Sequence, residues 1–197
     1  DIAGERTGVV PSREWKRNAF SRREDQVWFP GETVIAGIGQ GFTLVTPIQL
    51  ASAAAAMSMR GERYRTRLLI ATEHGISRDV VTHDPEPLTP VGDVDELHWR
   101  EVHDAMIGVA REPAGSGFRA MNGAEYSVAG KTGTAQVYSI AQDEEYDEEE
   151  LDEALRDHGL FIAFAAVEDR QIAVGVVVEN GGGSSAAVPV ARRILER

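Results

Sequence analysis

Two apolar runs near the carboxyl end of the chain restrict its fold more than any other feature. The first covers residues 160–167, the second covers residues 171–179, and the charged residues 168–170 separate them. Runs of this length that are rich in Val, Ile, Ala and Phe are typical of buried strands, and a short charged break is typical of a turn. The sequence therefore predicts a hairpin of two buried strands.

A third strand is predicted over residues 125–140, where apolar and polar residues alternate loosely. The small residues from Ala129 to Ala135 are expected to interrupt it. A short strand is also predicted at Leu68–Thr72, whereas the three prolines within residues 83–92 predict a loop there.

A helix is predicted to begin after Thr46, because Pro47 and Gln49 complete an N-terminal capping signal. This helix should continue to Arg60 and stop at Gly61. Its many alanines predict close packing on neighbouring elements.

A second helix is predicted to start at Asp93, with Glu96 three residues later, and to end at Pro113 and the turn of residues 115–117. Its apolar residues recur near the helical period and predict one buried face. Residues 186–197 are predicted to form a closing helix, and residues 1–36 to be a surface segment with short helical pieces. These elements predict the α+β class, an antiparallel sheet with packed helices. The predicted buried face of the second helix comprises Val94, Leu97, Val102, Met106 and Val109.

The composition excludes several classes of function. Asp and Glu number 32 against 20 Lys and Arg, a net charge of −12, so no nucleic-acid partner is expected, because phosphate binding needs clustered cations. The chain has no cysteine, which excludes disulfides, thiolate zinc sites and cysteine nucleophiles. No apolar run approaches the roughly 18 residues of a membrane span, and no secretory signal pattern is present.

Residues 143–153 hold nine carboxylates in eleven positions, which predicts a solvated excursion. The spacing of a calcium loop is missing. His98 and His103 lie five residues apart on a predicted helix, too far around it to share a metal, so neither a metal nor a cofactor is expected. His158 is predicted to have a structural role, hydrogen-bonding the turn before the 160–167 strand.

The string Gly130-Lys131-Thr132-Gly133-Thr134 is the sharpest chemical signal in the sequence. A phosphate-binding loop needs a glycine at position 125, where Glu125 stands, and a helix directly after Thr132. The alternative is Lys-Thr-Gly on an edge strand, where one ammonium group and two hydroxyls can hold an anionic carboxylate. A glycine there leaves room for an extended peptide, and the next backbone N–H can face a carbonyl oxygen.

The surroundings of this string resemble the carboxy-terminal part of the transpeptidase domain of the class B penicillin-binding proteins. They are closest to the elongation-type group, penicillin-binding protein 2. The resemblance covers essentially all of residues 1–197 as part of a single domain. It is carried by Pro11-Ser-Arg-Glu-Trp15, Gly37-Ile-Gly-Gln-Gly41, Thr46-Pro-Ile-Gln49, Ala129-Gly-Lys-Thr-Gly-Thr-Ala-Gln136, Leu155-Arg-Asp-His158, Phe161-Ile-Ala-Phe-Ala165 and Glu179-Asn-Gly-Gly182.

The family resemblance implies a serine-type peptidoglycan D,D-transpeptidase. The serine of a Ser-x-x-Lys motif attacks the terminal D-Ala-D-Ala bond of a stem peptide, and β-lactams acylate the same serine. No serine in this chain has a lysine three residues later, since Ser12 and Ser127 have one four residues later. The family's Ser-x-Asn or Ser-x-Asp motif is absent as well. The chain is therefore expected to be an inactive fragment of its parent protein.

The resemblance assigns site roles only to Lys131, Thr132, Gly133 and Thr134. It implies that Lys131 holds the region of the substrate carboxylate and assists proton transfer. It implies that Thr132 and Thr134 donate their hydroxyls, and that Thr134 also donates its backbone N–H to the oxyanion. Gly133 belongs to the surface that binds the substrate.

The family fold implied is a five-stranded antiparallel sheet wrapped by helices, the penicillin-binding-protein/β-lactamase-like fold. Residues 126–140, 160–167 and 171–179 would be its last three strands. The two missing strands would cover the edge of 171–179, and an exposed edge strand is a template for pairing with another chain. The isolated chain is therefore expected to be sticky, dimeric or rearranged at this edge.

The implied partners are stem peptides ending in D-Ala-D-Ala and β-lactam antibiotics. Through the parent protein they also include a RodA-type glycosyltransferase and the scaffold proteins of cell elongation. The implied location is the periplasmic side of the bacterial inner membrane, with an anchor upstream of Asp1. The alternative hypothesis is a non-catalytic module of the same fold that binds cell-wall peptide or elongation partners.

Overall fold

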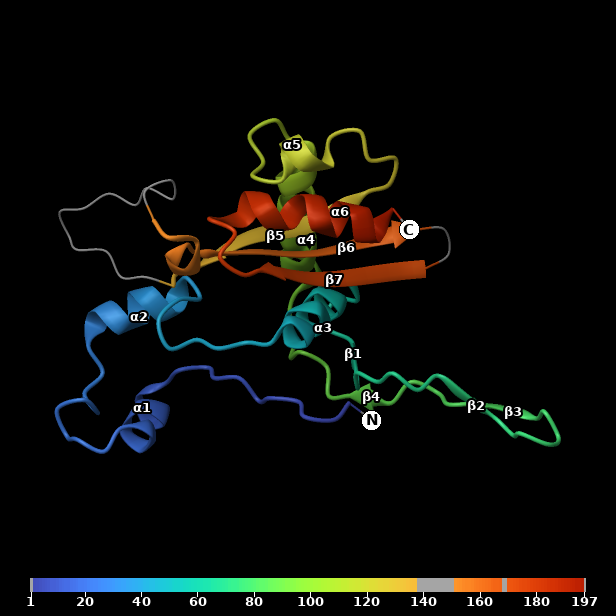
Figure 1. The fold of residues 1–197 in the computed structure, drawn as a ribbon, viewed down its shortest axis with the longest axis horizontal. Coiled ribbons are helices and arrows are strands. Elements are labelled where there is room, and N and C mark those ends of the chain that lie inside the picture. Colours follow the sequence, from blue (N-terminus) through green and yellow to red (C-terminus); the bar gives the residue numbers. More distant parts are fainter. Residues whose placement is uncertain (1, 138–150, 168–169, 197) are drawn as a thin grey trace. The chain divides into compact units, whose positions relative to one another are not determined.

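The structure, a computed structural model, describes residues 2–137, 151–167 and 170–196 (Figure 1). The chain divides into two compact units, Arg6–Thr46 and a larger unit of Asp1–Glu5 with Pro47–Arg197. Most of the acidic run, with its predicted excursion, lies outside the described residues. Within the described ranges, no helix is both long enough and apolar enough to span a bilayer.

The smaller unit contains two short helices, α1 (Arg13–Ala19) and α2 (Pro30–Gly37), as predicted for this segment. Ser12 caps α1, because its Oγ accepts a hydrogen bond of 3.0 Å from the N–H of Trp15. These helices are the short helical pieces expected before residue 37.

The larger unit is built on an antiparallel sheet of three strands in the order β5-β6-β7. The predicted hairpin is confirmed by β6 (His158–Val167) and β7 (Arg170–Val178), which pair along their whole length. Strand β5 (Val128–Ala135) pairs with β6 and places Thr132 opposite Phe161. The third predicted strand therefore lies at one edge of the sheet.

The prediction that small residues interrupt this third strand is wrong, since β5 runs through all of them. The reason is the close packing above the strand. A Cβ atom added at Gly130 would come within 2.4 Å of the Phe161 ring. Small residues thus let the strand lie against its neighbour, where larger side chains would push it away.

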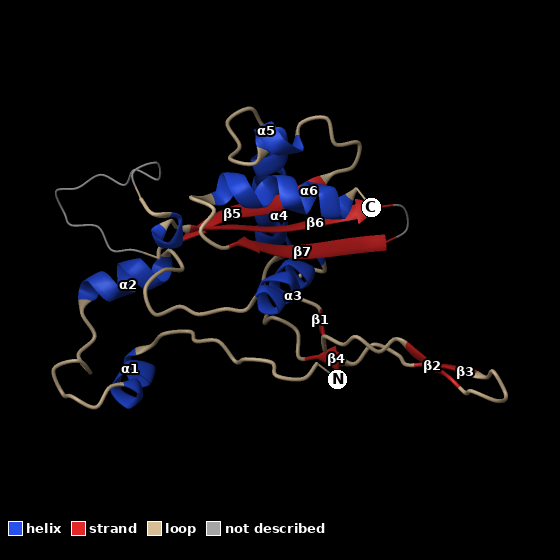
Figure 2. Cartoon of the chain, in the orientation of Figure 1, coloured by secondary structure: helices blue, strands red, loops and turns tan. Residues whose placement is uncertain are grey.

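Helices cover both faces of this sheet (Figure 2). Helix α6 (Ala187–Leu195) packs on one face, where Val174 and Val176 of β7 point. Gly175 lies between these valines and so faces the other side, which α3 (Pro47–Ser58) covers. A Cβ at Gly175 would lie 2.8 Å from the backbone oxygen of Pro47, so the helix lies directly on the strand backbone.

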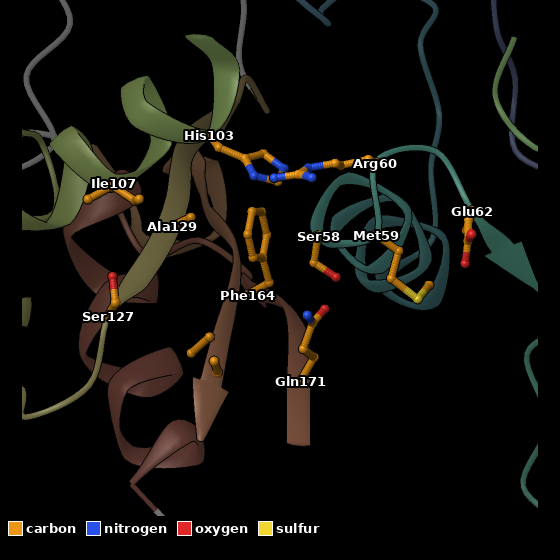
Figure 3. Close-up of a pocket in the computed structure, with 12 residues that line it drawn as sticks. Ser58, Met59, Arg60, Glu62, His103, Ile107, Ser127, Ala129, Phe164 and Gln171 are labelled. Atoms are coloured by element: carbon orange, nitrogen blue, oxygen red, sulfur yellow. The ribbon is translucent and has the colours of Figure 1, made fainter. Parts of the chain in front are cut away.

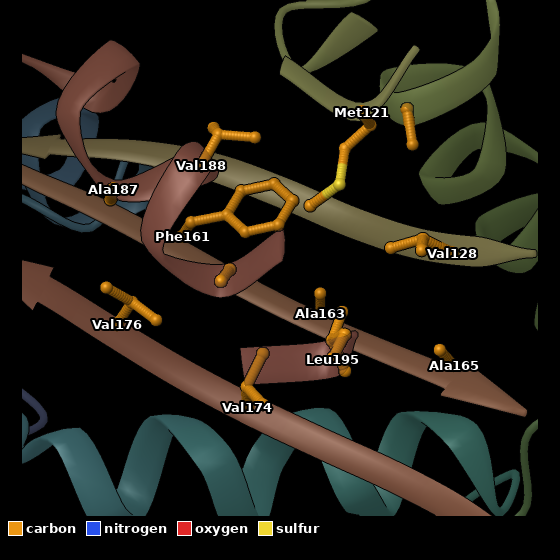
Figure 4. Close-up of a cluster of buried hydrophobic side chains, with 12 residues drawn as sticks. Met121, Val128, Phe161, Ala163, Ala165, Val174, Val176, Ala187, Val188 and Leu195 are labelled. Carbon is orange, nitrogen blue, oxygen red and sulfur yellow. The ribbon is translucent and has the colours of Figure 1, made fainter. Parts of the chain in front are cut away.

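The core fills the space between α6 and the sheet (Figure 4). Its largest fully buried side chains are Phe161, Val128 and Val188, from β6, β5 and α6. Met121 joins them from the short helix α5 (Phe118–Met121). The buried cluster comprises Ala110, Met121, Val128, Phe161, Ala163, Ala165, Val174, Val176, Ala187, Val188, Ala191 and Leu195.

The alanine-rich helix α3 packs closely, as predicted, and Ala54 is completely buried. It ends at Ser58, two residues before the predicted Arg60. Arg60 and Gly61 then adopt left-handed backbone conformations with φ of 53° and 93°. The predicted stop at Gly61 therefore belongs to the turn that follows the helix.

Helix α4 (Glu96–Arg111) forms where the second helix was predicted, but its cap and its buried face differ. Asp95, and not Asp93, caps it, since its carboxylate accepts a hydrogen bond of 2.8 Å from the N–H of Leu97. Met106 of the predicted face is buried, but Leu97 is 52% exposed, and Trp99 and Ala110 are buried in addition. The prediction is therefore confirmed at Met106, and the rest of the face is shifted toward Trp99, which the aliphatic pattern omits.

Residues 62–92 form an extended arm with four short strands, all of them exposed or half-buried. The predicted strand at Leu68–Thr72 is shifted, and residues 83–92, predicted as a loop, contain part of a strand pair. In the arm, β1 (Arg63–Tyr64) pairs with β4 (Pro87–Leu88), and β2 (Ala71–Glu73) pairs with β3 (Val80–Thr82). Two short 3-10 helices, Glu153–Leu155 and Ser184–Ala186, complete the described elements of the larger unit.

Candidate active site

The residues of the Lys-Thr-Gly string lie next to one another on β5, the edge strand of the sheet. Lys131 and Thr134 are exposed, Gly133 is half-buried and Thr132 is only 9% exposed. Because side chains alternate along a strand, Lys131 and Thr132 point to opposite faces. The edge therefore presents a cation from one face and hydroxyls from the other.

The ammonium group of Lys131 folds back along the strand in this structure. Its Nζ donates a hydrogen bond of 2.7 Å to the backbone oxygen of Thr132. An exposed lysine held by one carbonyl keeps two more donor hydrogens for an anionic ligand. Gly133 follows, and a Cβ there would meet Leu160 at 3.3 Å, so the residue sits tightly against β6.

The hydroxyl of Thr132 forms a hydrogen bond of 2.8 Å with the hydroxyl of Ser116. Sequence reasoning assigned Ser116 only to the turn that ends a helix. The sequence carries only a weak signal for this contact. Ser116 precedes Thr132 by 16 positions, and the one local feature that distinguishes it is a glycine on either side. The fold thus adds a hydroxyl that the motif itself does not contain.

Both ends of β5 are fixed by polar contacts to other elements. Before the strand, a guanidinium nitrogen of Arg111 donates to the backbone oxygen of Tyr126 at 2.8 Å. Burial raises the pKa of the Tyr126 hydroxyl. After the strand, the N–H of Val137 donates to the buried carboxylate of Asp157 at 3.1 Å. These contacts hold the strand that carries the candidate site.

His158 has a structural contact, but with a different turn from the one predicted. Its Nδ1 accepts a hydrogen bond of 2.9 Å from the N–H of Asn180, which follows β7. Asn180 has left-handed backbone with φ of 54° and donates from its side chain to the backbone of Ala154 and Arg156. His158 thus secures the turn after β7.

The two histidines on α4, His98 and His103, show no arrangement that suggests catalysis. His103 contacts the backbone oxygen of Met57 at 2.6 Å, and its ring lies 5.2 Å from that of Phe164. His98 is exposed. Across the residues that the structure describes, no group of three or more His, Asp or Glu side chains is arranged to hold a metal.

An open pocket of about 610 Å³ lies at the start of β5, between α3, α4 and the ends of the sheet strands (Figure 3). Arg60, His103, Phe164 and Gln171 line it, together with Ala129, two residues before Lys131. None of residues 131–134 belongs to its lining. The pocket is therefore separate from the Lys-Thr-Gly edge.

The arrangement on β5 suits the binding of an anionic, extended ligand. An edge strand can pair with a peptide backbone, and the cation and hydroxyls beside it can hold a carboxylate. Thr134 already takes part in an interaction, so a ligand would share or replace that contact.

Comparison with known proteins gives one consistent family. The family described as penicillin binding protein transpeptidase domain matches residues 1–196. The peptidoglycan D,D-transpeptidase MrdA of Escherichia coli K12 is 37% identical over 196 residues, which is 100% of this chain and 30% of that protein. MrdA of Acinetobacter baumannii is 38% identical over 196 residues, which is 100% of this chain and 28% of that protein. The chain thus spans about 30% of the length of the curated relatives it matches.

Solved structures agree with this family. The crystal structure of Pseudomonas aeruginosa PBP2 in complex with WCK 5153 is 36% identical and has a TM-score of 0.75, covering 100% of this chain and 39% of that one. PBP2 of Helicobacter pylori, solved in a complex with MreC, also has a TM-score of 0.75 at 23% identity, over 98% of this chain and 32% of that one. The second likeness shows the shared fold.

Proposed function

The chain belongs to the penicillin-binding protein transpeptidase family, and we propose that it forms the carboxy-terminal part of a peptidoglycan D,D-transpeptidase domain. The domain would include all of residues 1–197, and the family match over residues 1–196 supports this extent. The observation that carries the proposal is Lys131, Thr132 and Thr134 on an edge strand, where an extended stem peptide can lie beside them.

In the proposed reaction, a serine oxygen bonds to the carbonyl carbon of the D-Ala-D-Ala peptide bond. The peptide C–N bond between the two D-Ala residues then breaks. The proton from the serine is transferred to the amine of the D-Ala that is released. The amine of a neighbouring stem peptide then takes the acyl group, and the serine oxygen regains a proton. A part of the protein outside this sequence supplies the serine, because no serine here has a lysine three residues later.

In this scheme the residues of β5 bind the stem peptide and orient it for the reaction. Lys131 holds the region of the substrate carboxylate from one face of the strand and assists proton transfer. Thr132 and Thr134 donate their hydroxyls from the other face, to a ligand that lies along the edge itself. The N–H of Thr134 donates to the developing oxyanion, where a fixed donor stabilises charge most. Gly133 keeps the strand surface clear for the peptide backbone.

The partners proposed for the whole protein are D-Ala-D-Ala stem peptides, β-lactams, a RodA-type glycosyltransferase and elongation scaffold proteins. The complex of Helicobacter pylori PBP2 with MreC supports the last group by analogy. The proposed location is the periplasmic side of the inner membrane, with an anchor that precedes this chain.

Intact-mass spectrometry after incubation with excess penicillin tests the proposal. The full-length protein that carries this chain should gain the mass of one penicillin, and the 197-residue chain should gain none. Lys131→Met in the full-length protein should slow the acylation by roughly tenfold or more, because the ligand carboxylate loses its cation. Absence of an adduct on the full-length protein would favour the non-catalytic module instead.

A further inference from the structure

Ser116 and Thr132 join two parts of the fold at the candidate site. Their hydroxyl oxygens are 2.8 Å apart, within the usual range for such a hydrogen bond. Thr132 is 9% exposed, while Ser116 is exposed in the turn between α4 and α5. Ser116 therefore lies at the outer end of a two-hydroxyl chain that reaches into the sheet edge.

The turn that holds Ser116 has little freedom to move. A Cβ at Gly115 would lie 2.4 Å from the backbone oxygens of both Gly108 and Val109, so the turn packs directly on the end of α4. The N–H of Gly117 donates to the oxygen of Val109 at 3.0 Å. Glycines on both sides of Ser116 thus fix the position of its hydroxyl relative to β5.

The direction of this hydrogen bond decides what Thr132 can do. A hydroxyl has one proton, so Thr132 can donate either to Ser116 or to a ligand, but not to both. If Ser116 donates to Thr132, the proton of Thr132 is available to a ligand carboxylate. A donor behind Thr132 also strengthens the bond that Thr132 makes, because hydrogen bonds in a chain polarise one another.

We propose that Ser116 is a positioning residue, which donates its hydroxyl proton to Thr132 and so directs the proton of Thr132 to the carboxylate of a bound substrate or β-lactam. This inference rests on the proposed function of Lys131–Thr134 as the carboxylate-binding edge. It adds to the Lys-Thr-Gly motif a residue from a different turn, supplied by the end of α4.

The test compares penicillin G with its methyl ester, in which the carboxylate charge is absent, on the full-length protein. Ser116→Ala should lower the acylation rate constant for the free acid by about fivefold to tenfold, the effect of one lost hydrogen bond. The rate constant for the ester should fall by less than about twofold, because it offers Thr132 no charged acceptor. Ser116→Thr keeps a hydroxyl and should restore most of the rate for the acid.

Two further variants make the result decisive. Ser127→Ala removes an exposed hydroxyl just before β5 and should leave both rate constants unchanged. Thr132→Val should slow the acid reaction by itself, and Ser116→Ala added to it should have no further effect. A shared thermal midpoint among the variants shows that they are folded, and Ser116→Cys, of similar size, replaces Ser116→Ala if the latter unfolds.

The outcomes separate the two proposals. Equal losses for acid and ester in Ser116→Ala, or additive losses in the double variant, would overturn the positioning role and leave the site intact. An unchanged acid rate in Thr132→Val would instead overturn the assignment of the β5 edge as the carboxylate site.

Discussion

The ammonium group of Lys16 forms an ion pair with Glu32, and this contact joins α1 to α2 in the unit Arg6–Thr46. The two side chains are only 6% and 20% exposed. The same nitrogen donates to the backbone oxygen of Val27 at 2.7 Å and lies 5.3 Å from the ring centroid of Phe29. The other carboxylate oxygen of Glu32 accepts a hydrogen bond of 2.7 Å from the N–H of Phe29.

Lys16→Met should loosen this unit, because Glu32 and the backbone oxygen of Val27 would both lose the buried ammonium group that donates to them. Limited proteolysis within residues 6–46 should accelerate by roughly tenfold or more, whereas the sheet should stay protected. The matched control is Arg22→Met, which breaks the ion pair between Arg22 and Asp25. The Arg22 side chain is 73% exposed, so the cleavage rate of this variant should change little. Equal cleavage rates for all three proteins would show that the Lys16 contact does not hold the unit together.

The same contact predicts a loss of stability in acid. Hydrogen bonds from Lys16 and from the backbone of Phe29 lower the pKa of Glu32 below its ordinary 4.5. A lowered pKa stabilises the folded unit above pH 4.5, and this contribution is lost as the pH falls below that value toward the folded pKa. Hydrogen exchange of the α1 and α2 amides, corrected for intrinsic rates, should accelerate in that window. Glu32→Gln should remove this step, and an unchanged step in that variant would assign it to another carboxyl group.

Gly175→Ala should destabilise the larger unit, because the new methyl group would lie 2.8 Å from the oxygen of Pro47 and 2.9 Å from the nitrogen of Ala51. Backbone atoms cannot turn aside, so α3 must lift from β7 at a cost of about 1–3 kcal/mol. Thermal or urea unfolding measures the difference. Gly75→Ala, with open space around the site of its Cβ, is the control and should be nearly neutral. A neutral Gly175→Ala would mean that α3 does not lie on the strand backbone.

The hairpin and the helix positions could be predicted because each follows from a local pattern. Residues 160–167 are apolar throughout, residues 172–178 contain no polar side chain, and Pro47 fixes the start of α3. The strand at β5 was predicted, but its continuity through Ala129–Ala135 was missed, because glycine and alanine have low strand propensity. What selects a strand there is the ring of Phe161 above Gly130, a contact between residues 31 positions apart.

The candidate site was predictable only as far as its motif extends. Lys131 and Thr132 are adjacent in sequence, so any strand that contains them places both at the same point along its length, with their side chains on opposite faces. Ser116 reaches Thr132 through the packing of the α4–α5 turn, which no local pattern encodes. The same limit applies to α4, where the position of Trp99 against Gly61 decides the buried face.

His158→Ala should destabilise the larger unit by about 1–2 kcal/mol, because the N–H of Asn180 would lose its acceptor. In the full-length protein the acylation rate by penicillin should stay within about twofold, since His158 acts on the turn and does not touch the Lys-Thr-Gly residues. Unfolding and acylation measured side by side separate these two effects. His98→Ala, on an exposed surface of α4, is the control and should alter neither. A large loss of acylation at unchanged stability would instead give His158 a role in the reaction.

Strand β7 stands at the other edge of the described sheet and predicts association of the isolated chain. The sheet order is β5-β6-β7, and α3 and α6 cover the faces of β7 without adding a strand beside it. Such an edge offers backbone donors and acceptors to a second copy. Light scattering should give a mass that rises with concentration, and hydrogen exchange of the β7 amides should slow in parallel.

The exposed arm offers a competing explanation for such association, because Ile76 at its tip is 91% exposed. Ile76→Ser should therefore leave the association unchanged if β7 is the contact. A monomer mass of 21.4 kDa at every concentration would contradict pairing at this edge. Loss of association in Ile76→Ser, with β7 exchange independent of concentration, would move the contact to the arm.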